Sequence, residues 1–190
     1  MNEVLHFLQS IHSLSPQLID YLSKNMKCRE LQKKEYLLRA GHISQSVCFI
    51  QQGLLRAFYT KGDKDVTSWF MKEGDISVSI ESFYDQVESY ENIQALEDCI
   101  LYYINHRELE YIYREFDEFN FIGRILTIKY HKLWVKQLYS IRMQSACDRY
   151  KWLLENHPDL LIRVPAKYIA SYLDITDVTL STIRAKMMKK

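Results

Sequence analysis

The residues best placed to do chemistry lie near the C-terminus, between Pro165 and Lys186. Two short helical patterns follow one another here, and Pro165 stands where the first turn of a helix tolerates proline. Thr176 or Asp177 can cap the second helix. The apolar residues that would face one another across the two helices and their turn are Ile169, Ala170, Leu173, Ile175, Leu180 and Ile183. This spacing predicts a helix-turn-helix.

The outer face of the second predicted helix is small and polar, and basic residues follow it. A helix of this kind can enter the major groove of DNA, which is about 12 Å wide. Hydroxyl groups can bond base edges or phosphates, and Lys and Arg can contact the backbone. An ordinary helical hairpin would satisfy the apolar spacing alone, but these polar features favour DNA binding. The residues expected to contact DNA are Lys167, Thr176, Thr179, Ser181, Thr182, Arg184 and Lys186, with Lys189 and Lys190 adding backbone contacts.

Shorter segments rich in β-branched and aromatic residues occupy the region from about Leu31 to Asn105. Most of them end in turn residues, which is typical of strands. Many short strands at regular intervals predict a small antiparallel barrel or roll. Ahead of them, Ser15 and Pro16 have the types and positions of a helix N-cap and first turn. Four glycines lie in the turns between the predicted strands: Gly41, Gly53, Gly62 and Gly74.

A long helix is predicted from about Asp117 to Tyr139, with two apolar stripes that must be buried on two sides. One stripe contains Phe119, Ile122, Leu126 and Leu133, and the other contains Phe121, Ile125, Ile128 and Val135. The first can cover the roll, and the second can pair with the same helix of a symmetry mate. The alternative is a helix buried entirely within one domain.

The order of these parts resembles the Crp/Fnr transcriptional regulators. The residues that carry the resemblance are the TLSTIR run (Thr179–Arg184), Gly41, Gly53, the Glu73-Gly74-Asp75 turn, the ALED run (Ala95–Asp98) and Ser145–Leu154. The resemblance implies an α+β fold. An N-terminal antiparallel β-roll (a double-stranded β-helix like that of cyclic-nucleotide-binding domains), with flanking helices, would span residues 1–116. A dimerisation helix would span 117–141, and a winged-helix-like helix-turn-helix domain would span 142–190. The implied partners are double-stranded DNA and a second copy of the chain, with RNA polymerase as a further candidate.

The nucleotide pocket of that family uses a Glu and an Arg that this sequence lacks. Counting from Gly74, Ser79 stands in place of the Glu, and Ser89 and Tyr90 stand in place of the Arg and the hydroxyl residue after it. A bidentate guanidinium makes phosphate recognition strong, and a charge-assisted contact is worth about 1.5–3 kcal/mol. We therefore predict a pocket that does not bind cAMP or cGMP and that holds a neutral or cationic effector, or none. The expected pocket residues are Ser79, Glu81, Ser82, Ser89, Tyr90 and Asn92.

The second helix of the predicted motif also departs from the family. Thr182 stands where relatives that recognise G·C pairs carry an Arg, which can bond guanine O6 and N7 together. Asp174 occupies the turn position usually held by glycine and tolerates left-handed geometry better than most residues but less well than glycine. We expect an operator different from the family's usual one, and DNA affinity that is modest or depends on an effector.

Charge and composition exclude several other classes. Residues 61–120 carry 15 acidic and 5 basic side chains, whereas residues 121–162 and 163–190 each have a net charge of +4. This asymmetry fits a chain that presents its C-terminal third to a polyanion. The four cysteines are isolated, so no zinc or iron-sulfur site and no cofactor is expected, and free thiols indicate a reducing compartment. With no signal peptide and no membrane span, we expect a cytoplasmic protein.

Two alternatives remain open at this stage. The chain could be a ligand-sensing or protein-interaction module whose DNA-binding head is degenerate. An enzyme has less support, because the histidines lie in no nucleophile or metal motif. Haem ligation is the remaining metal hypothesis, and its candidate ligands are His42, Cys99 and His106.

Overall fold

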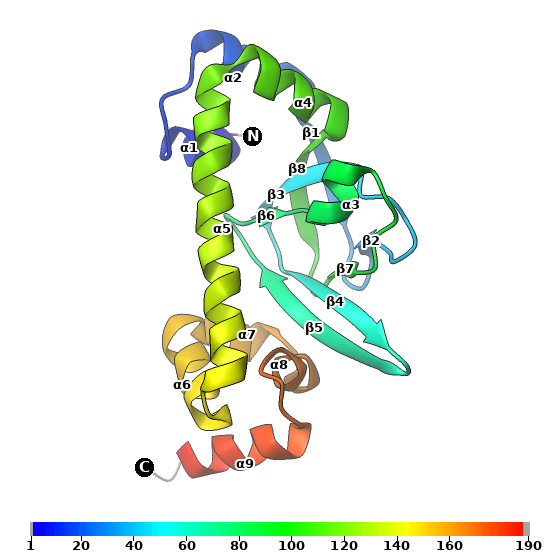
Figure 1. Cartoon of the computed structure of the whole chain (residues 1–190), viewed down its shortest axis with the longest axis vertical. Coiled ribbons are helices and arrows are strands. Elements are labelled where there is room, and N and C mark those ends of the chain that lie inside the picture. Colours follow the sequence, from blue (N-terminus) through cyan, green and yellow to red (C-terminus); the bar gives the residue numbers. More distant parts are fainter. Residues whose placement is uncertain (1, 188–190) are drawn as a thin grey trace. The chain divides into compact units, whose positions relative to one another are not determined.

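The structure is a computed structural model that describes residues 2–187; Lys189 and Lys190, predicted to contact DNA, lie outside the described residues. The chain divides into two compact units (Figure 1). The first unit combines Met1–Phe58 with Phe70–Ile128, and the second combines Tyr59–Trp69 with Lys129–Lys190. The long helix α5 (Asp117–Met143) and the hairpin of β4 (Leu55–Lys61) and β5 (Lys64–Met71) each contribute to both units.

Two four-stranded sheets form the roll, with strand orders β1-β8-β3-β6 and β2-β7-β4-β5. The paired strands run antiparallel, as the sequence predicts. The strands are β1 (Lys27–Leu31), β2 (Tyr36–Leu38), β3 (Ser46–Gln52), β4 (Leu55–Lys61), β5 (Lys64–Met71), β6 (Ile76–Ser77), β7 (Asn92–Ala95) and β8 (Cys99–Asn105). A short helix, α3 (Ile80–Asp85), follows β6.

The turn between β3 and β4 requires glycine. Gly53 has a φ of 100°, a region that residues with a Cβ rarely adopt. A Cβ at this position would also lie 2.6 Å from the carbonyl oxygen of Asp98. The backbone of this turn can therefore approach the backbone at Asp98, in the turn after β7, only because position 53 has no side chain.

Helices of the first unit cover one face of the β1-β8-β3-β6 sheet (Figure 1). They are α1 (Asn2–Gln9), α2 (Pro16–Asn25), α4 (His106–Glu115) and the start of α5. The Ser15 side chain caps α2 by accepting from the Leu18 N–H at 3.2 Å, as predicted. In α5, Phe119 and Ile122 of the predicted inner stripe are buried in the same core as Phe49 of β3. The helix begins at Asp117 as expected and ends four residues beyond Tyr139.

The second unit contains helices and the tip of a hairpin. Its further helices are α6 (Ala146–Asn156), α7 (Pro158–Arg163), α8 (Ala166–Tyr172) and α9 (Asp177–Met187). Within residues 144–187 the structure describes helices and turns but no strand, so no wing strand is seen there.

The tip of the β4–β5 hairpin, residues 59–69, packs within this second unit. The Thr67 N–H donates to Ser171 Oγ at 2.8 Å, and that hydroxyl donates to the Asp65 carbonyl at 3.1 Å. Trp69 stacks against Trp134 of α5, with ring centroids 5.8 Å apart. The sequence predicts two strands joined by a turn at Gly62, and nothing in that pattern divides each strand between two units, so this division is a tertiary feature.

The structure bears on three further features of the sequence: its cysteines, its apolar segments and its potential metal ligands. All four cysteines are free, Cys28 and Cys147 being exposed and Cys48 and Cys99 buried. Among residues 2–187, no helix is both long and apolar enough to cross a bilayer. Within the same range, no group of three or more His, Cys, Asp or Glu side chains is placed to hold a metal ion.

Candidate DNA-binding surface and effector pocket

The predicted helix-turn-helix segment folds as two helices, α8 and α9, joined by residues 173–176. Thr176 caps α9, because its Oγ1 accepts the Thr179 N–H at 3.1 Å. Asp174 has a φ of 52°, the left-handed conformation that the sequence predicts for this turn. In this conformation the Ile175 N–H turns back to donate to the Ala170 carbonyl at 3.0 Å, which closes the C-terminal end of α8.

All but one of the apolar residues predicted to pack between the two helices are buried. Ile169 and Ala170 of α8 and Leu180 and Ile183 of α9 are buried. Ala170 is 1 % exposed, consistent with a close approach of the helices at a small residue. Ile175 in the turn is half-buried and contributes less to the core than the spacing suggested.

Arg149 of α6 holds the turn in place, a role that no local pattern in the sequence indicates. The side chain is 9 % exposed. Its Nε donates to the Leu173 carbonyl at 2.8 Å, and its Nη1 donates to the Gln144 carbonyl at 2.7 Å. Longer contacts reach the carbonyls of Ile141 and Asp174, both at 3.4 Å. One buried cation therefore joins the end of α5 to the turn before α9, where the last carbonyls of a helix favour positive charge.

The residues predicted to contact DNA divide into two groups. Five of them are exposed in the second unit: Lys167, Thr176, Ser181, Thr182 and Lys186. The other two, Thr179 and Arg184, are half-buried. The Arg184 guanidinium carbon lies 5.8 Å from the centre of the Tyr150 ring, so this side chain leans toward α6. Thr182 Oγ1 donates to the Val178 carbonyl at 2.9 Å, which leaves its lone pairs to accept from a donor on DNA.

The predicted effector pocket contains a small hydrogen-bonded group. Ser79 and Ser89 are buried, with their hydroxyl oxygens 3.1 Å apart. Ser89 Oγ also accepts the Glu91 N–H at 3.1 Å. Ser79 hydrogen-bonds the Glu91 carboxylate; burial raises the pKa of Glu91, and this hydrogen bond partly opposes the rise. A partly buried acid thus lies beside the two serines that replace the family's Glu and Arg. Glu91 is not among the residues predicted for this site.

The other four predicted pocket residues point elsewhere. Ser82 Oγ accepts the Ser44 N–H at 2.9 Å and donates to the Val87 carbonyl at 2.6 Å. Asn92 Oδ1 accepts the Ala40 N–H at 3.1 Å. Glu81 and Tyr90 are exposed, and their mutual hydrogen bond raises the pKa of the Tyr90 hydroxyl. The structure brings Ser79 and Ser89 together, whereas Ser82 and Asn92 bond nearby backbone and Glu81 bonds Tyr90.

This geometry leads to a first prediction, on cyclic nucleotides. A cyclic phosphate placed at Ser79 and Ser89 would meet the Glu91 carboxylate and no cation between Glu73 and Arg107. Like charges at close range are unfavourable where water is scarce. We expect isothermal titration calorimetry of the whole protein with cAMP and with cGMP to show no binding. Micromolar affinity for either nucleotide would contradict this prediction.

Known proteins share features with this chain in both sequence and structure. Residues 28–116 match the family model of the cyclic nucleotide-binding domain. FixK2 from Bradyrhizobium japonicum has a TM-score of 0.73 at 15% identity, covering 86% of this chain and 85% of its own. A mutant of CooA from Carboxydothermus hydrogenoformans has a TM-score of 0.73 at 20% identity, covering 96% and 84%. The global regulator CLP of Xanthomonas campestris has a TM-score of 0.72 at 12% identity, covering 92% of each chain.

The family model shows a cyclic nucleotide-binding domain over residues 28–116, and the structural similarities show that the chain shares the fold of these proteins. Another similar structure is described as a regulator of the Crp/Fnr family, from Eubacterium rectale, with a TM-score of 0.72 at 14% identity. The comparison with curated proteins returned no match.

Proposed function

We propose that this protein is a DNA-binding transcriptional regulator of the Crp/Fnr type that works as a homodimer. In this proposal residues 1–116 form the effector domain, 117–141 the dimerisation helix and 142–190 the DNA-binding domain. The observation that carries it is α9, whose buried side packs on α8 while its other side exposes Ser181, Thr182 and Lys186. A helix presented in this way can lie in a major groove.

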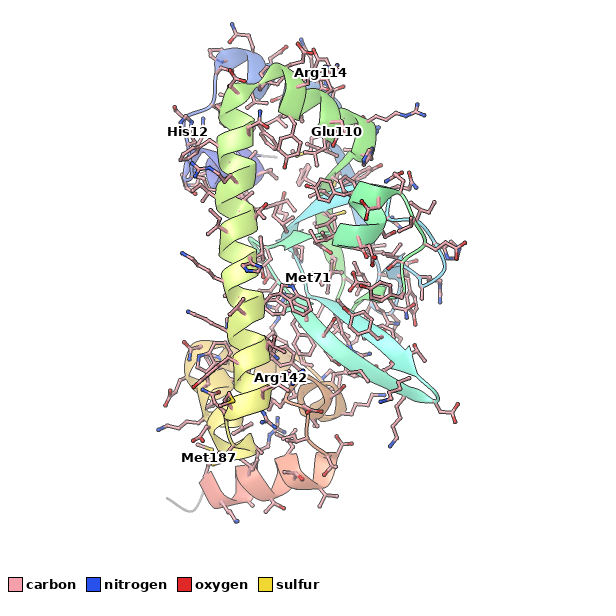
Figure 2. The ribbon with its side chains drawn as sticks, in the orientation of Figure 1. His12, Met71, Glu110, Arg114, Arg142 and Met187 are labelled. Atoms are coloured by element: carbon pink, nitrogen blue, oxygen red, sulfur yellow. The ribbon has the colours of Figure 1, made fainter. Side chains whose placement is uncertain are left out.

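The proposed dimer rests on the outer stripe of α5. Phe121, Ile128, Val135 and Tyr139 are 38%, 41%, 52% and 60% exposed. With Ile125 and Lys132 they repeat at alternating spacings of four and three residues, the pattern of a coiled-coil seam. Figure 2 shows side chains projecting from α5 along its length, with Arg142 labelled near its C-terminal end. Several large exposed apolar side chains in one row favour a covering partner, and a second α5 has the matching surface.

The charge distribution supports the proposed DNA contact. Residues 163–190 hold six basic and two acidic side chains, and Lys167 and Lys186 are exposed. Neutralising DNA phosphates releases counterions, so binding of this kind weakens steeply as salt rises. One residue opposes it: Asp177 at the start of α9 would repel a nearby phosphate. This favours modest affinity over tight binding.

A second prediction tests the proposed contact. We expect a gel shift with genomic fragments, including the DNA beside the protein's own gene, to give a complex that is salt-sensitive and prefers some sequences. Lys186→Ala and Arg184→Ala should each weaken binding and lower the slope of log affinity against log salt by about one, the effect of losing one phosphate contact. Lys24→Ala is the matched control, because Lys24 is an exposed lysine of α2 paired with Asp20.

Two outcomes would count against this proposal. A shift whose salt slope is unchanged in both variants would remove α9 from the interface. If no fragment shifts at low salt, the alternative function, a sensing or interaction module with a degenerate head, becomes the better one. Asp177 and the absence of an Arg at position 182 are the features of the chain that favour this alternative.

A further inference from the structure

A cavity of about 320 Å³ lies within the first unit, separate from the predicted effector pocket. It is lined by strands of both sheets and by the loop that joins β2 to β3. The polar lining residues that matter here are Arg29, Arg39, His42, Gln45, Ser46 and Ser77. None of the six predicted pocket residues lines it. Its volume is at the lower end of the range of small-molecule sites, about 300–1,000 Å³.

The inner wall of this cavity carries a buried hydroxyl that is unsatisfied. Ser77 is 0% exposed, and among residues 2–187 its Oγ has no hydrogen-bond partner. Ser77 pairs with Cys48 of β3, and residues directly opposite in a sheet point to the same face. Cys48 is buried in the roll. A buried hydroxyl without a partner is uncommon and marks a place for a water or a ligand group.

The outer wall carries positive charge. Arg29 and Arg39 line the cavity together with His42, and the lining contains no Asp or Glu. The Arg39 guanidinium carbon lies 3.7 Å from the centre of the Tyr36 ring, and such stacking holds a guanidinium in place. Burial raises the pKa of Cys48 to about 11, an effect that Ser46 and the charge of Arg29 partly oppose. Arg29 is therefore close enough to influence a buried residue of the roll.

The rest of the lining is apolar. Leu38 and Ile93 are buried where they line the cavity, and Tyr36 is half-buried beside them. A ligand for this space needs an anionic group and a small apolar or neutral body. The predicted pocket and this cavity therefore differ in charge, because the Glu91 carboxylate lies in the first and two arginines line the second.

We propose that the roll cavity binds a small organic oxyanion, held by Arg29, Arg39 and Ser77, with its remaining atoms against Tyr36, Leu38 and Ile93. Carboxylate and phosphate groups share the geometry that guanidinium groups bind best. This site differs from the pocket that the sequence resemblance implied, and it reverses the expected charge of the ligand. The inference does not depend on DNA binding.

Calorimetry and amide chemical shifts of the whole protein test this proposal. The probes are inorganic phosphate, citrate and 3-phosphoglycerate, with glycerol as a neutral control. We expect saturable binding of at least one anion, with shifts at Ser77 and at residues 39–46, and no binding of glycerol. Comparing the affinities for phosphate and for citrate shows whether the cavity prefers a phosphoryl group or a carboxylate group.

Variants of the lining residues show whether the anion binds in this cavity. Arg29→Gln and Arg39→Gln alter exposed side chains, so both proteins should fold, and each should weaken binding about tenfold or more. Ser77→Ala should weaken it by a smaller factor. Arg114→Gln, an exposed arginine of α4 paired with Glu115, is the matched control and should bind normally. Absence of saturable binding by all three anions, or equal binding by the Arg39→Gln and Arg114→Gln proteins, would overturn the proposal.

Discussion

Replacing Arg149 by methionine is expected to lower the free energy of unfolding of the second unit by about 3 kcal/mol or more. The substitution keeps much of the side-chain volume but removes the donors to the carbonyls of Leu173 and Gln144. Those carbonyls would lose charge-assisted hydrogen bonds next to the turn that orients α9. Urea denaturation followed by tryptophan fluorescence is the measurement, because Trp69, Trp134 and Trp152 all belong to the second unit.

One further variant separates the hydrogen bonds of Arg149 from its positive charge, and another serves as a control. Arg149→Lys keeps the charge but cannot reproduce the planar fork that contacts several carbonyls at once, so it should recover only part of the loss. Arg142→Met is the matched control, because Arg142 is an exposed arginine near the end of α5 and should change stability little. Equal stability of the Arg149→Met and Arg142→Met proteins would show that the contacts of Arg149 contribute nothing to the unit.

Introducing glutamate at Ile128 and Val135 together is expected to convert the proposed dimer into monomers. Both side chains are exposed in the single chain, at 41% and 52%, so the substitution should leave each folded chain intact. In the proposed dimer the same positions form the apolar seam, where four unpaired carboxylates would be buried. Sedimentation velocity should show a halved mass. Affinity for a two-site operator should fall by about 100-fold or more, because the second head is no longer tethered to the first.

The control for this experiment is Thr127→Glu. Thr127 is exposed and lies next to the seam without belonging to it; its substitution adds one carboxylate per chain, whereas the seam variant adds two. This protein should remain dimeric. A wild-type chain that sediments as a monomer at tens of micromolar would refute the proposed seam directly, and DNA binding would then need another explanation.

Several features of the fold could be predicted because they depend on residues close together in the chain. Ser15 caps α2, Thr176 caps α9, and Asp174 adopts the left-handed conformation. Each depends on hydrogen bonds or backbone preferences within a few residues. The strand and helix patterns depend in the same way on periodicity, so the antiparallel roll and the start of α5 at Asp117 also followed from the sequence.

The candidate sites could be predicted only in part. The sequence shows that Ser79 and Ser89 replace the family's phosphate-binding residues, since this is a matter of residue type. It does not show that Glu91 turns its carboxylate toward Ser79, because a side-chain direction depends on what surrounds it. For the same reason Ser82 and Asn92, chosen as pocket residues from their position in the loop, instead bond the backbone of residues 40–44.

In the helix-turn-helix segment, too, some features could be predicted from the sequence and others depend on the tertiary structure. The sequence by itself determined which residues pack between α8 and α9 and which face outward, because helical periodicity assigns the faces. The tertiary structure alone decided that Arg149 joins the turn to α5, that residues 59–69 pack beside Ser171, and that Ser77 lines the same cavity as two arginines. Those contacts join residues tens of positions apart. Their geometry follows from how whole elements pack, which no local pattern in the sequence encodes.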